Sequence, residues 1–533
     1  MVPNSATDRL VPTRRQVLSG LALTATATAA SAVAATGSAT DQHPAPASTT
    51  PAARTPPSLD ATASIELDGV CEVVTDESGE TVFCATQDGF AVVDVSDPEN
   101  PSVLAEERDL TVNGEGPMLD IFDVKYDEDR LLVAGPNSGT GRSDLVGFFL
   151  YDVSDPASPE RVAFQRTNHG IHNCFLADGY VYLTGGSTPG SPTIIWDVRD
   201  DDPTKVADWS ATQSNSDWER VGSNFQQTHD IFVQDDVLYV AYWDAGTWLV
   251  DVSDPANPSA ITRLGGHDVA YLSEISSAQG LNPEFFELPG NSHYVLPNGD
   301  ASAVFVGKEA WDNDETDLDG GPGGIELWSR DGETRESIIQ TPAGPDSNAT
   351  AHNLGVRDDR LYASWYAGGV AVYDVSDLAE PQVLGVWSDA ETTSFWSAKP
   401  IHDGVVGASY YDPSLSRDEN NEGEGGQLFV FAEPSSDGEP APTMEARPKP
   451  VVETTSEPDD GSDSDGGTSD GTATTDSDSA DGGDATTEAT NTDSSATGSD
   501  GDEGGSTPGF GVLATVAAAG GTLGLARWLA DDG

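Results

Sequence analysis

The chain has 533 residues, with 91 acidic and 24 basic side chains, and a formal net charge of −67 at pH 7. This composition excludes a nucleic-acid partner, because binding a phosphate backbone needs stripes of Lys and Arg that are absent. Such an acidic excess repels itself at low salt, whereas molar salt shortens the Debye length to about 3 Å, so the composition indicates an extreme halophile.

The first 35 residues are predicted to be a targeting segment. Arg14 and Arg15 precede a short run rich in Ala and Thr that ends at about residue 35. The arrangement resembles a twin-arginine signal, with Val17 where the motif usually has Phe. It implies passage through the twin-arginine export machinery and removal of the segment. Residues 36–61 are predicted to be a disordered linker.

An apolar strand followed by Asp-Val-Ser-Asp, usually with Pro next, recurs along the chain and indicates the fold. Complete or partial copies occupy residues 92–98, 150–156, 195–198, 249–255 and 372–377. Several short strands and Gly, Asp or Pro turns separate them, which gives units of 36 to 65 residues. Units of this kind are typical of a β-propeller.

Seven such units fit residues 62–433. They begin near Val73, Phe122, His172, His229, His293, His352 and Trp396. The last unit shows only three strands, while a strand at residues 64–67 is left over before the first unit. We therefore predict an all-β, seven-bladed β-propeller closed by its N-terminal strand, since closure removes the exposed sheet edges.

The Asp-Val-Ser-Asp-Pro units, with the strands that accompany them, resemble the LVIVD-repeat family over about residues 62–433. The resemblance is specific because the turn and the strand recur together. It implies a secreted or surface β-propeller, but it implies no activity.

Three cysteines lie in the predicted propeller. Cys71 and Cys84 flank a hairpin whose turn is expected at residues 76–79, and counting outward from that turn places them opposite each other. A cross-strand disulfide is one interpretation outside the cytoplasm, and two buried thiols are the other. Cys174 is predicted to be buried.

Four of the eight histidines share one position of the repeat, the start of the first strand: His172, His229, His293 and His352. The first strand of each blade lines the channel of a propeller, so these side chains are candidates for one transition-metal site. Carotenoid oxygenases, which are seven-bladed, hold iron with convergent histidines in this way. In the alternative interpretation the repeats inherited a histidine that bonds within its own blade. Glu72, Asp123 and Asp230 lie next to the same position and are candidate carboxylate partners of the imidazoles.

The sequence suggests two other candidate sites, one for Ca²⁺ and one for a glycan. The acidic insertion at residues 312–319 offers oxygens for Ca²⁺, although it lacks the Gly and Glu positions of an EF-hand loop, and the alternative is a solvated loop. Asn348 begins an Asn-Ala-Thr sequon and is a candidate for N-glycosylation.

The C-terminal region is predicted to be a stalk followed by an anchor. Residues 434–507 contain 19 acidic side chains among Ser, Thr and Gly, which predicts a disordered stalk. Pro508, Gly509 and Phe510 then precede an apolar segment at about 511–530, within a tail that extends to residue 533. This tail resembles the Pro-Gly-Phe sorting signal of haloarchaeal surface proteins, which implies processing by an archaeosortase. One Arg stands where that family has a basic cluster. Either a retained transmembrane helix or a lipid would attach the chain to the membrane.

No nucleophile elbow, phosphate loop, zinc pair or dinucleotide fingerprint occurs in the sequence. The sequence therefore favours a non-enzymatic, cell-surface binding module for an extracellular protein or glycan, exported and anchored to the outer face of the membrane. The alternative is an extracytoplasmic metal-dependent oxidoreductase that uses the four histidines. Metal analysis separates the two.

Overall fold

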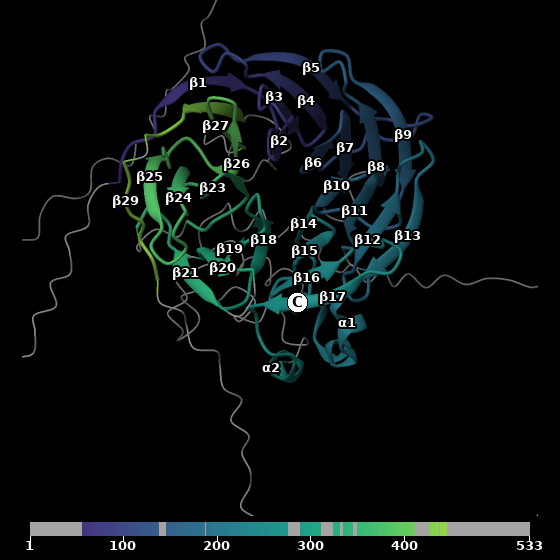
Figure 1. Cartoon of the computed structure of the whole chain (residues 1–533). Coiled ribbons are helices and arrows are strands. Elements are labelled where there is room, and N and C mark those ends of the chain that lie inside the picture. The colour runs from purple at the N-terminus through teal and green to yellow at the C-terminus, as the bar shows by residue number, and fades with distance from the viewer. Residues whose placement is uncertain are drawn as a thin grey trace, which may run out of the picture. The chain divides into compact units, whose positions relative to one another are not determined.

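The computed structural model describes residues 56–137, 145–186, 188–275, 288–310, 323–330, 334–344, 349–410, 426–435 and 437–444. In this part of the chain seven antiparallel sheets are arranged as blades around a common axis (Figure 1). The predicted all-β, seven-bladed fold is confirmed. No helix among these residues is long and apolar enough to cross a membrane.

The strands of each blade run from the axis outward in chain order. Blade 1 contains β2 (Val73–Thr75), β3 (Thr81–Ala85), β4 (Gly89–Asp94) and β5 (Ser102–Arg108), and blade 2 contains β6 (Asp123–Asp127), β7 (Arg130–Gly135), β8 (Gly147–Asp152) and β9 (Glu160–Arg166). Blade 3 contains β10 (Cys174–Ala177), β11 (Tyr180–Thr184), β12 (Thr193–Asp197) and β13 (Thr204–Trp209), and blade 4 contains β14 (Asp230–Gln234), β15 (Val237–Ala241), β16 (Thr247–Asp251) and β17 (Ser259–Leu264).

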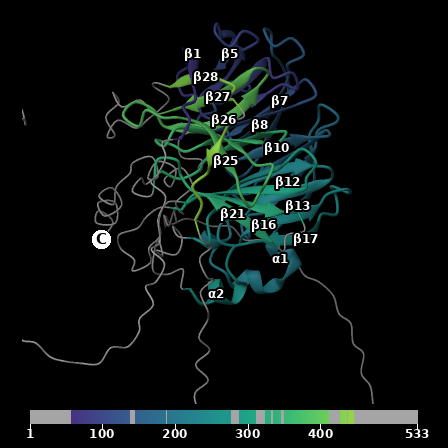
Figure 2. The same cartoon turned by 60° about the vertical axis from the view of Figure 1, so that its left-hand side comes forward.

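Blade 5 follows the same plan, blade 6 carries a fifth strand, β29 (Glu439–Pro440), outside β25 (Gln382–Trp387), and blade 7 takes its outer strand from the N-terminal part of the chain. Blade 5 contains β18 (Ser292–Pro297), β19 (Ala303–Lys308), β20 (Ile325–Ser329) and β21 (Arg335–Ile339), and blade 6 contains β22 (Leu354–Arg357), β23 (Arg360–Ser364), β24 (Val370–Asp374) and β25 (Gln382–Trp387). Blade 7 contains β26 (Phe395–Ile401), β27 (Gly404–Ser409), β28 (Gln427–Ala432) and, as its outer strand, β1 (Ala61–Glu66). The short helices α1 (Ala211–Ser214), η1 (Ser216–Arg220) and η2 (Ser223–Phe225) connect blades 3 and 4, and α2 (Val269–Glu274) connects blades 4 and 5. Both views place α1 and α2 on the same side of the blades (Figures 1 and 2).

The repeated Asp-Val-Ser-Asp motif forms the turn between the third and fourth strands. Asp94 Oδ1 accepts a hydrogen bond from the backbone N–H of Ser96 at 2.9 Å, and Asp97 Oδ1 accepts one from that of Glu99 at 3.2 Å. A β-bulge precedes the motif, because the register shifts between Val92 and Val93. The side-chain bonds and the bulge explain why Asp recurs here, since carboxylates form such turns readily.

The hydrophobic core lies between neighbouring blades. Leu132 and Phe148 of blade 2, for example, pack against Cys174 and Leu183 of blade 3, and none of the four is exposed. Each blade is therefore stabilised by the blade beside it.

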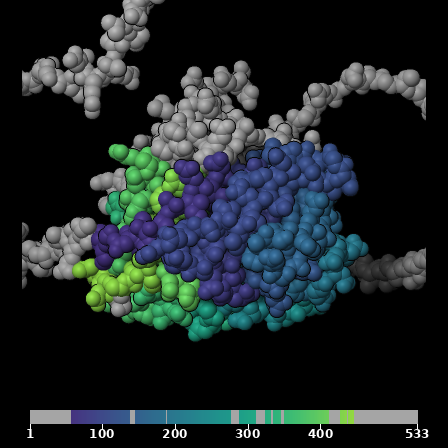
Figure 3. Space-filling model, turned by 90° about the horizontal axis from the view of Figure 1, so that it is seen from above, coloured from purple at the N-terminus to yellow at the C-terminus, as the bar shows by residue number. Residues whose placement is uncertain are grey.

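The structure places β1 where the sequence predicts the closing strand. β1 pairs antiparallel with β28, with Ser64 opposite Phe429 and Ile65 opposite Leu428. The N-terminal strand consequently lies beside the last strands of the propeller (Figure 3).

Two predicted boundaries are wrong. Residues 56–61, expected to belong to a linker, include Leu59, which is buried against blade 6 and donates its N–H to Val386 O at 2.9 Å. Residues 437–444, expected to begin the disordered stalk, include β29 (Glu439–Pro440), which pairs with β25, and Met444, which donates its N–H to Ile338 O at 3.0 Å. Composition predicted disorder because both segments are polar, but each pairs its backbone with an outer strand that would otherwise be unpaired.

Candidate metal centre

The first strands of blades 3 to 6 position the four histidines. His172, His229 and His352 lie one or two residues before β10, β14 and β22, and His293 lies in β18, next to its first residue. Hydrogen bonds to the second strand hold this backbone, with His229 N donating to Ala241 O at 2.8 Å and His352 N to Ser364 O at 2.9 Å. β10, β14 and β18 lie around the axis of the propeller (Figure 1), so residues at this position of the repeat lie near the centre of the ring.

The four imidazoles form one buried cluster. The ring centroids of His172 and His229 are 4.2 Å apart, those of His229 and His293 are 3.9 Å apart, and those of His293 and His352 are 4.6 Å apart. The interpretation in which each histidine bonds within its own blade is wrong, because three of them use acceptors on a neighbouring blade. The residues just before the first strand of a blade lie near the axis, where neighbouring blades meet.

Those three histidines share one hydrogen-bonding pattern. In His172, Nδ1 contacts Asn137 Oδ1. In His229, Nδ1 contacts His293 O at 3.1 Å, and in His352 it contacts Trp396 O at 2.7 Å. An oxygen acceptor at Nδ1 keeps the proton there and leaves the lone pair on Nε2. Metal-binding histidines are commonly oriented in this way, by an oxygen bonded to the other ring nitrogen.

The Nε2 atoms of His172 and His229 are only 2.9 Å apart. In the metal-free chain one ring can donate an Nε2–H to the other across this distance. With both protons on Nδ1 the two Nε2 atoms are instead available to one cation. For metal–nitrogen bonds of about 2.1 Å, two ligands at a right angle are about 3.0 Å apart, so the observed spacing suits neighbouring positions on one ion.

Burial makes all four imidazoles neutral. It lowers the pKa of His172 to about 3, with a further contribution from His352, and it lowers the pKa of His352 to about 4 although the bond to Trp396 O acts in the opposite direction. The pKa values of His229 and His293 also lie well below their ordinary range, through burial and then the neighbouring imidazoles. Neutral imidazole is the form that binds metal ions.

Glu309 adds a carboxylate to the cluster. It directly follows β19, and its Oε2 lies 3.3 Å from His293 Nε2. One ligand atom from each of His229, His293 and Glu309 lies within 4.8 Å of the other two. Burial raises the pKa of Glu309 to about 8, against the opposing effect of the hydrogen bond from Tyr366.

Sequence reasoning missed Glu309, Asn137 and the aromatic residues Trp243 and Tyr366. All four lie just after the second strand of a blade, close to the histidine position of the same sheet. The Tyr366 ring lies 4.6 Å from that of His352, and the Trp243 ring lies 5.1 Å from that of His229. Their shared place after a second strand becomes visible only once the strands are known, because the four side chains differ in chemistry.

The predicted carboxylate partners of the histidines are bonded elsewhere. Glu72 Oε1 lies 3.1 Å from Lys399 Nζ, and Asn353 donates to Glu72 Oε2. Asp123 pairs with Lys125 and accepts a bond from Cys174 N at 2.7 Å. These residues form a buried ionic layer next to the histidine cluster. Asp230 is buried in the same layer, and its pKa lies well above its ordinary range, first through burial and partly offset by Lys125.

The predicted disulfide is not formed. Cys71, Cys84 and Cys174 are free and buried. Cys84 lies opposite Val73 in the strand register, so Cys71 is two residues from the pairing position and its Sγ instead contacts Ala85 O at 3.6 Å.

Several predicted sites lie outside the described residues: Arg14, Arg15, the acidic loop at 312–319, Asn348, and Pro508, Gly509 and Phe510. They remain predictions.

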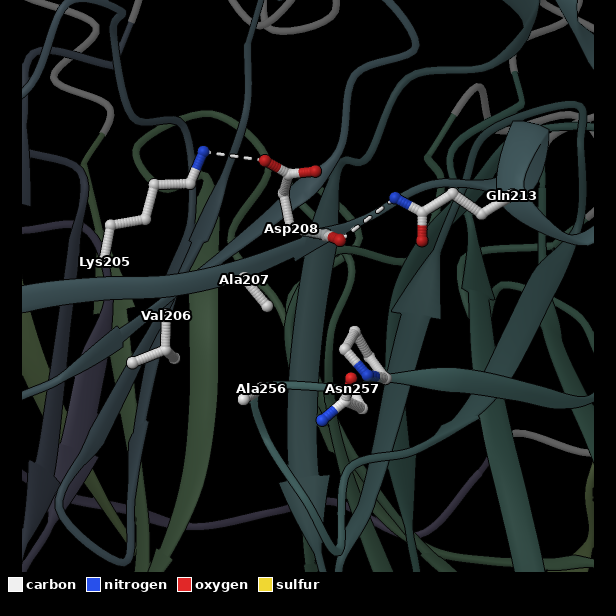
Figure 4. A pocket seen from close by; sticks show the side chains of 8 residues that line it. Lys205, Val206, Ala207, Asp208, Gln213, Ala256 and Asn257 are labelled. Atoms are coloured by element: carbon white, nitrogen blue, oxygen red, sulfur yellow. Dashed lines mark hydrogen bonds and ion pairs between the residues drawn. The ribbon is translucent and has the colours of Figure 1, made fainter.

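A separate surface pocket of about 590 Å³ lies far out on the blades (Figure 4). It is lined by residues of β13, Gln213 and the turn that includes Ala256 and Asn257. Lys205 Nζ binds Asp208 Oδ2 at 2.7 Å, and Gln213 donates to Asp208 O at 3.0 Å. Its lining belongs to outer strands and turns, whereas the histidines lie on inner strands, so the pocket is not part of the histidine site.

These features define a β-propeller with a buried histidine cluster at its axis. The chain contains LVIVD repeats, because residues 78–106 and 227–264 match the model of that repeat. The first match covers β3 and β4 with most of β5, and the second covers all of blade 4 together with His229.

Solved β-propeller structures match the chain at low sequence identity. The β-propeller domain of Myceliophteria thermophila Cps50 (Swd1) is 10% identical with a TM-score of 0.45, and the match covers 70% of this chain and 99% of that one. The WD40 β-propeller domain of Doa1 is 12% identical with a TM-score of 0.43, and the match covers 71% of this chain and 98% of that one. No curated protein matches the sequence. No function follows from these likenesses.

Proposed function

We propose that this chain is a metal-dependent β-propeller protein whose ion is bound by His172, His229, His293 and His352, with Glu309 beside them. The observation that carries the proposal is the buried cluster itself, in which His172 Nε2 and His229 Nε2 lie 2.9 Å apart. One ligand atom from each of His229, His293 and Glu309 also lies within 4.8 Å of the other two. With their protons on Nδ1, the imidazoles would offer Nε2 to a cation. The imidazoles are buried and neutral, so no second proton on their rings competes with the ion at neutral pH.

The donor set favours a first-row transition metal. Imidazole suits Fe, Zn, Cu and Ni, and two histidines with one carboxylate is a common arrangement for non-haem Fe(II). Ca²⁺ and Mg²⁺ are disfavoured because they prefer oxygen ligands. Iron or copper in this site would supply electron transfer or oxygen activation, so we propose an oxidoreductase rather than a purely structural ion site.

The residues of the chain would bind and orient the ion. Asn137, the carbonyl of His293 and the carbonyl of Trp396 fix three imidazole rings, so the Nε2 positions are set before metal arrives. A site prepared in this way loses little conformational entropy when the ion binds, which favours affinity.

The propeller itself is a module of a kind consistent with a binding role. We further propose that it is exported and held at the outer face of the cell membrane, where it would meet an extracellular protein or glycan. The support for this location is the sequence alone: the Arg14-Arg15 motif, the acidic region before residue 507 and the apolar segment at about 511–530.

The test is metal analysis of the whole chain, purified in molar salt after supply of Fe²⁺, Zn²⁺, Mn²⁺ or Cu²⁺. We expect about one ion per chain. We expect the double variant His172→Ala/His352→Ala to lose the ion and His402→Ala, which changes an exposed histidine on the loop between β26 and β27, to retain it. A folded wild-type chain with no stoichiometric ion under any supply would overturn the proposal.

A further inference from the structure

Glu309 is held on two sides. Its Oε1 accepts a hydrogen bond from the Tyr366 hydroxyl at 2.8 Å, while Oε2 lies 3.3 Å from His293 Nε2. Both residues are buried, and they come from different blades, since Glu309 follows β19 and Tyr366 follows β23. The phenol therefore restrains one carboxylate oxygen and leaves the other facing the imidazoles.

The backbone of Tyr366 adopts an uncommon conformation. Its φ is +47°, in the left-handed region that bulky residues rarely adopt. Two backbone bonds fix it there, because Tyr366 O accepts from Phe395 N at 3.0 Å and from Gly369 N at 3.1 Å. Strain of this kind persists where the surrounding structure imposes it, and it occurs often at functional sites.

Trp243 shows the same feature at the equivalent place in blade 4. Its φ is +46°, and its backbone forms a bridge to Ser292 of the next blade, as that of Tyr366 does to Phe395. Both aromatic rings then lie against histidines of the cluster. Gln87 of blade 1 has the same combination, with a φ of +59° and a bridge to Ile121, so the conformation is a feature of this turn of the repeat that places each side chain at the inner end of its blade.

We propose that Tyr366 is a positioning residue that holds Glu309 as a carboxylate ligand of the metal ion. This inference rests on the proposed function. The separation of 3.3 Å between Glu309 Oε2 and His293 Nε2 is close to the roughly 3.0 Å expected for neighbouring ligands of one ion, so Glu309 needs little movement to bind. Without the phenol, the carboxylate would rotate about its side-chain bonds and spend less time in the binding orientation.

The experiment is a double-mutant cycle with Co²⁺ as the probe, in molar salt, on the metal-stripped whole chain. We expect Tyr366→Phe to weaken Co²⁺ binding by about 10- to 100-fold, the range found when a partner of a ligand is removed. We expect Glu309→Gln to weaken binding at least as much. In the double variant the loss should equal that of Glu309→Gln alone, because Tyr366 acts only through Glu309.

The matched control is Tyr362→Phe. The Tyr362 hydroxyl also donates to a carboxylate, Glu433 Oε1 at 3.0 Å, in the same blade but away from the histidines. We expect it to leave Co²⁺ affinity unchanged, whatever it does to thermal stability. The absorption bands of bound Co²⁺, which report its coordination, should change in Tyr366→Phe and not in Tyr362→Phe.

The outcomes separate the two hypotheses. A wild-type chain that binds no Co²⁺ overturns both the inference and the proposed function. Binding by the wild type with full affinity and an unchanged spectrum in Tyr366→Phe overturns the role of Tyr366 alone. Losses that add in the double variant also overturn it, because Tyr366 would then act independently of Glu309.

Discussion

Acidification should destabilise the metal-free propeller through its buried histidines. The folded state keeps His172 neutral, with a pKa of about 3, whereas an unfolded histidine has a pKa of about 6.5. Because the folded pKa is the lower one, the unfolded chain binds more protons as pH falls below about 6.5. The contribution to stability is therefore complete above that pH and is lost as pH falls toward 3.

The magnitude follows from the width of this window. One pH unit is worth 1.36 kcal/mol for each proton bound only by the unfolded state. When the pH falls from 7 to 5, a histidine that stays neutral in the folded state thus lowers the free energy of unfolding by about 2 kcal/mol. Other buried groups titrate too, and the raised pKa of Glu309 opposes the effect, so the total pH dependence does not isolate a histidine.

A single variant isolates the contribution of His172 to this pH dependence. His172→Gln removes one such group. Between pH 7 and pH 5 the free energy of unfolding should therefore fall by about 2 kcal/mol less in this variant than in the wild type. The assay is urea unfolding at both pH values in molar salt with a chelator present. Trp243→Phe is the control, because it alters packing around the rings without removing a titrating group, and its effect should not vary with pH.

An equal effect of His172→Gln at pH 7 and pH 5 would refute the reasoning. It would mean that the folded protein also protonates His172 at pH 5, which contradicts a ring held neutral by burial. Saturation with metal should leave this acid sensitivity in place, because a metal-bound His172 also binds no extra proton while the unfolded histidine is still protonated at pH 5.

Three further predictions concern the scaffold. Deletion of β1 (Ala61–Glu66) should expose the edge of β28 and lower the melting temperature or cause aggregation in molar salt, and an unchanged melting curve would contradict closure by this strand. Removal of salt by dialysis should unfold the acidic propeller reversibly, as followed by circular dichroism, whereas equal stability at low ionic strength would show that its charges lie too far apart to matter. Glu72→Ala should cost about 3–5 kcal/mol in urea unfolding, because Lys125 and Lys399 would lose a buried partner, and a loss below about 1 kcal/mol would show that water reaches these lysines.

The fold could be predicted because one sequence motif repeats along the chain. Asp-Val-Ser-Asp recurs since each copy forms the same hydrogen-bonded turn, as at Asp94, Asp152, Asp251 and Asp374. The histidines could be found for the same reason, because they occupy one phase of the repeat. Their convergence needed the structure, since a shared phase is equally compatible with bonds inside each blade.

The other residues around the histidines show no repeated pattern in the sequence. The residues that follow the second strands include Asn137, Trp243, Glu309 and Tyr366, which share no charge and, apart from the two aromatic residues, no side-chain type. The predicted disulfide failed for a geometric reason, because the hairpin pairs Val73 with Cys84 and moving the turn centre by one residue moves every pair by two.

The bonds of the four histidines argue against simple inheritance of a structural residue. An inherited histidine would make the same bond in each blade. Instead, His229 and His352 donate to the carbonyl of the equivalent residue in the next blade, whereas His172 contacts Asn137 of the preceding blade and His293 faces Glu309. What the four share is a place in one buried cluster, in which consecutive ring centroids lie 3.9 to 4.6 Å apart. This proximity supports the proposal that these side chains bind one ion.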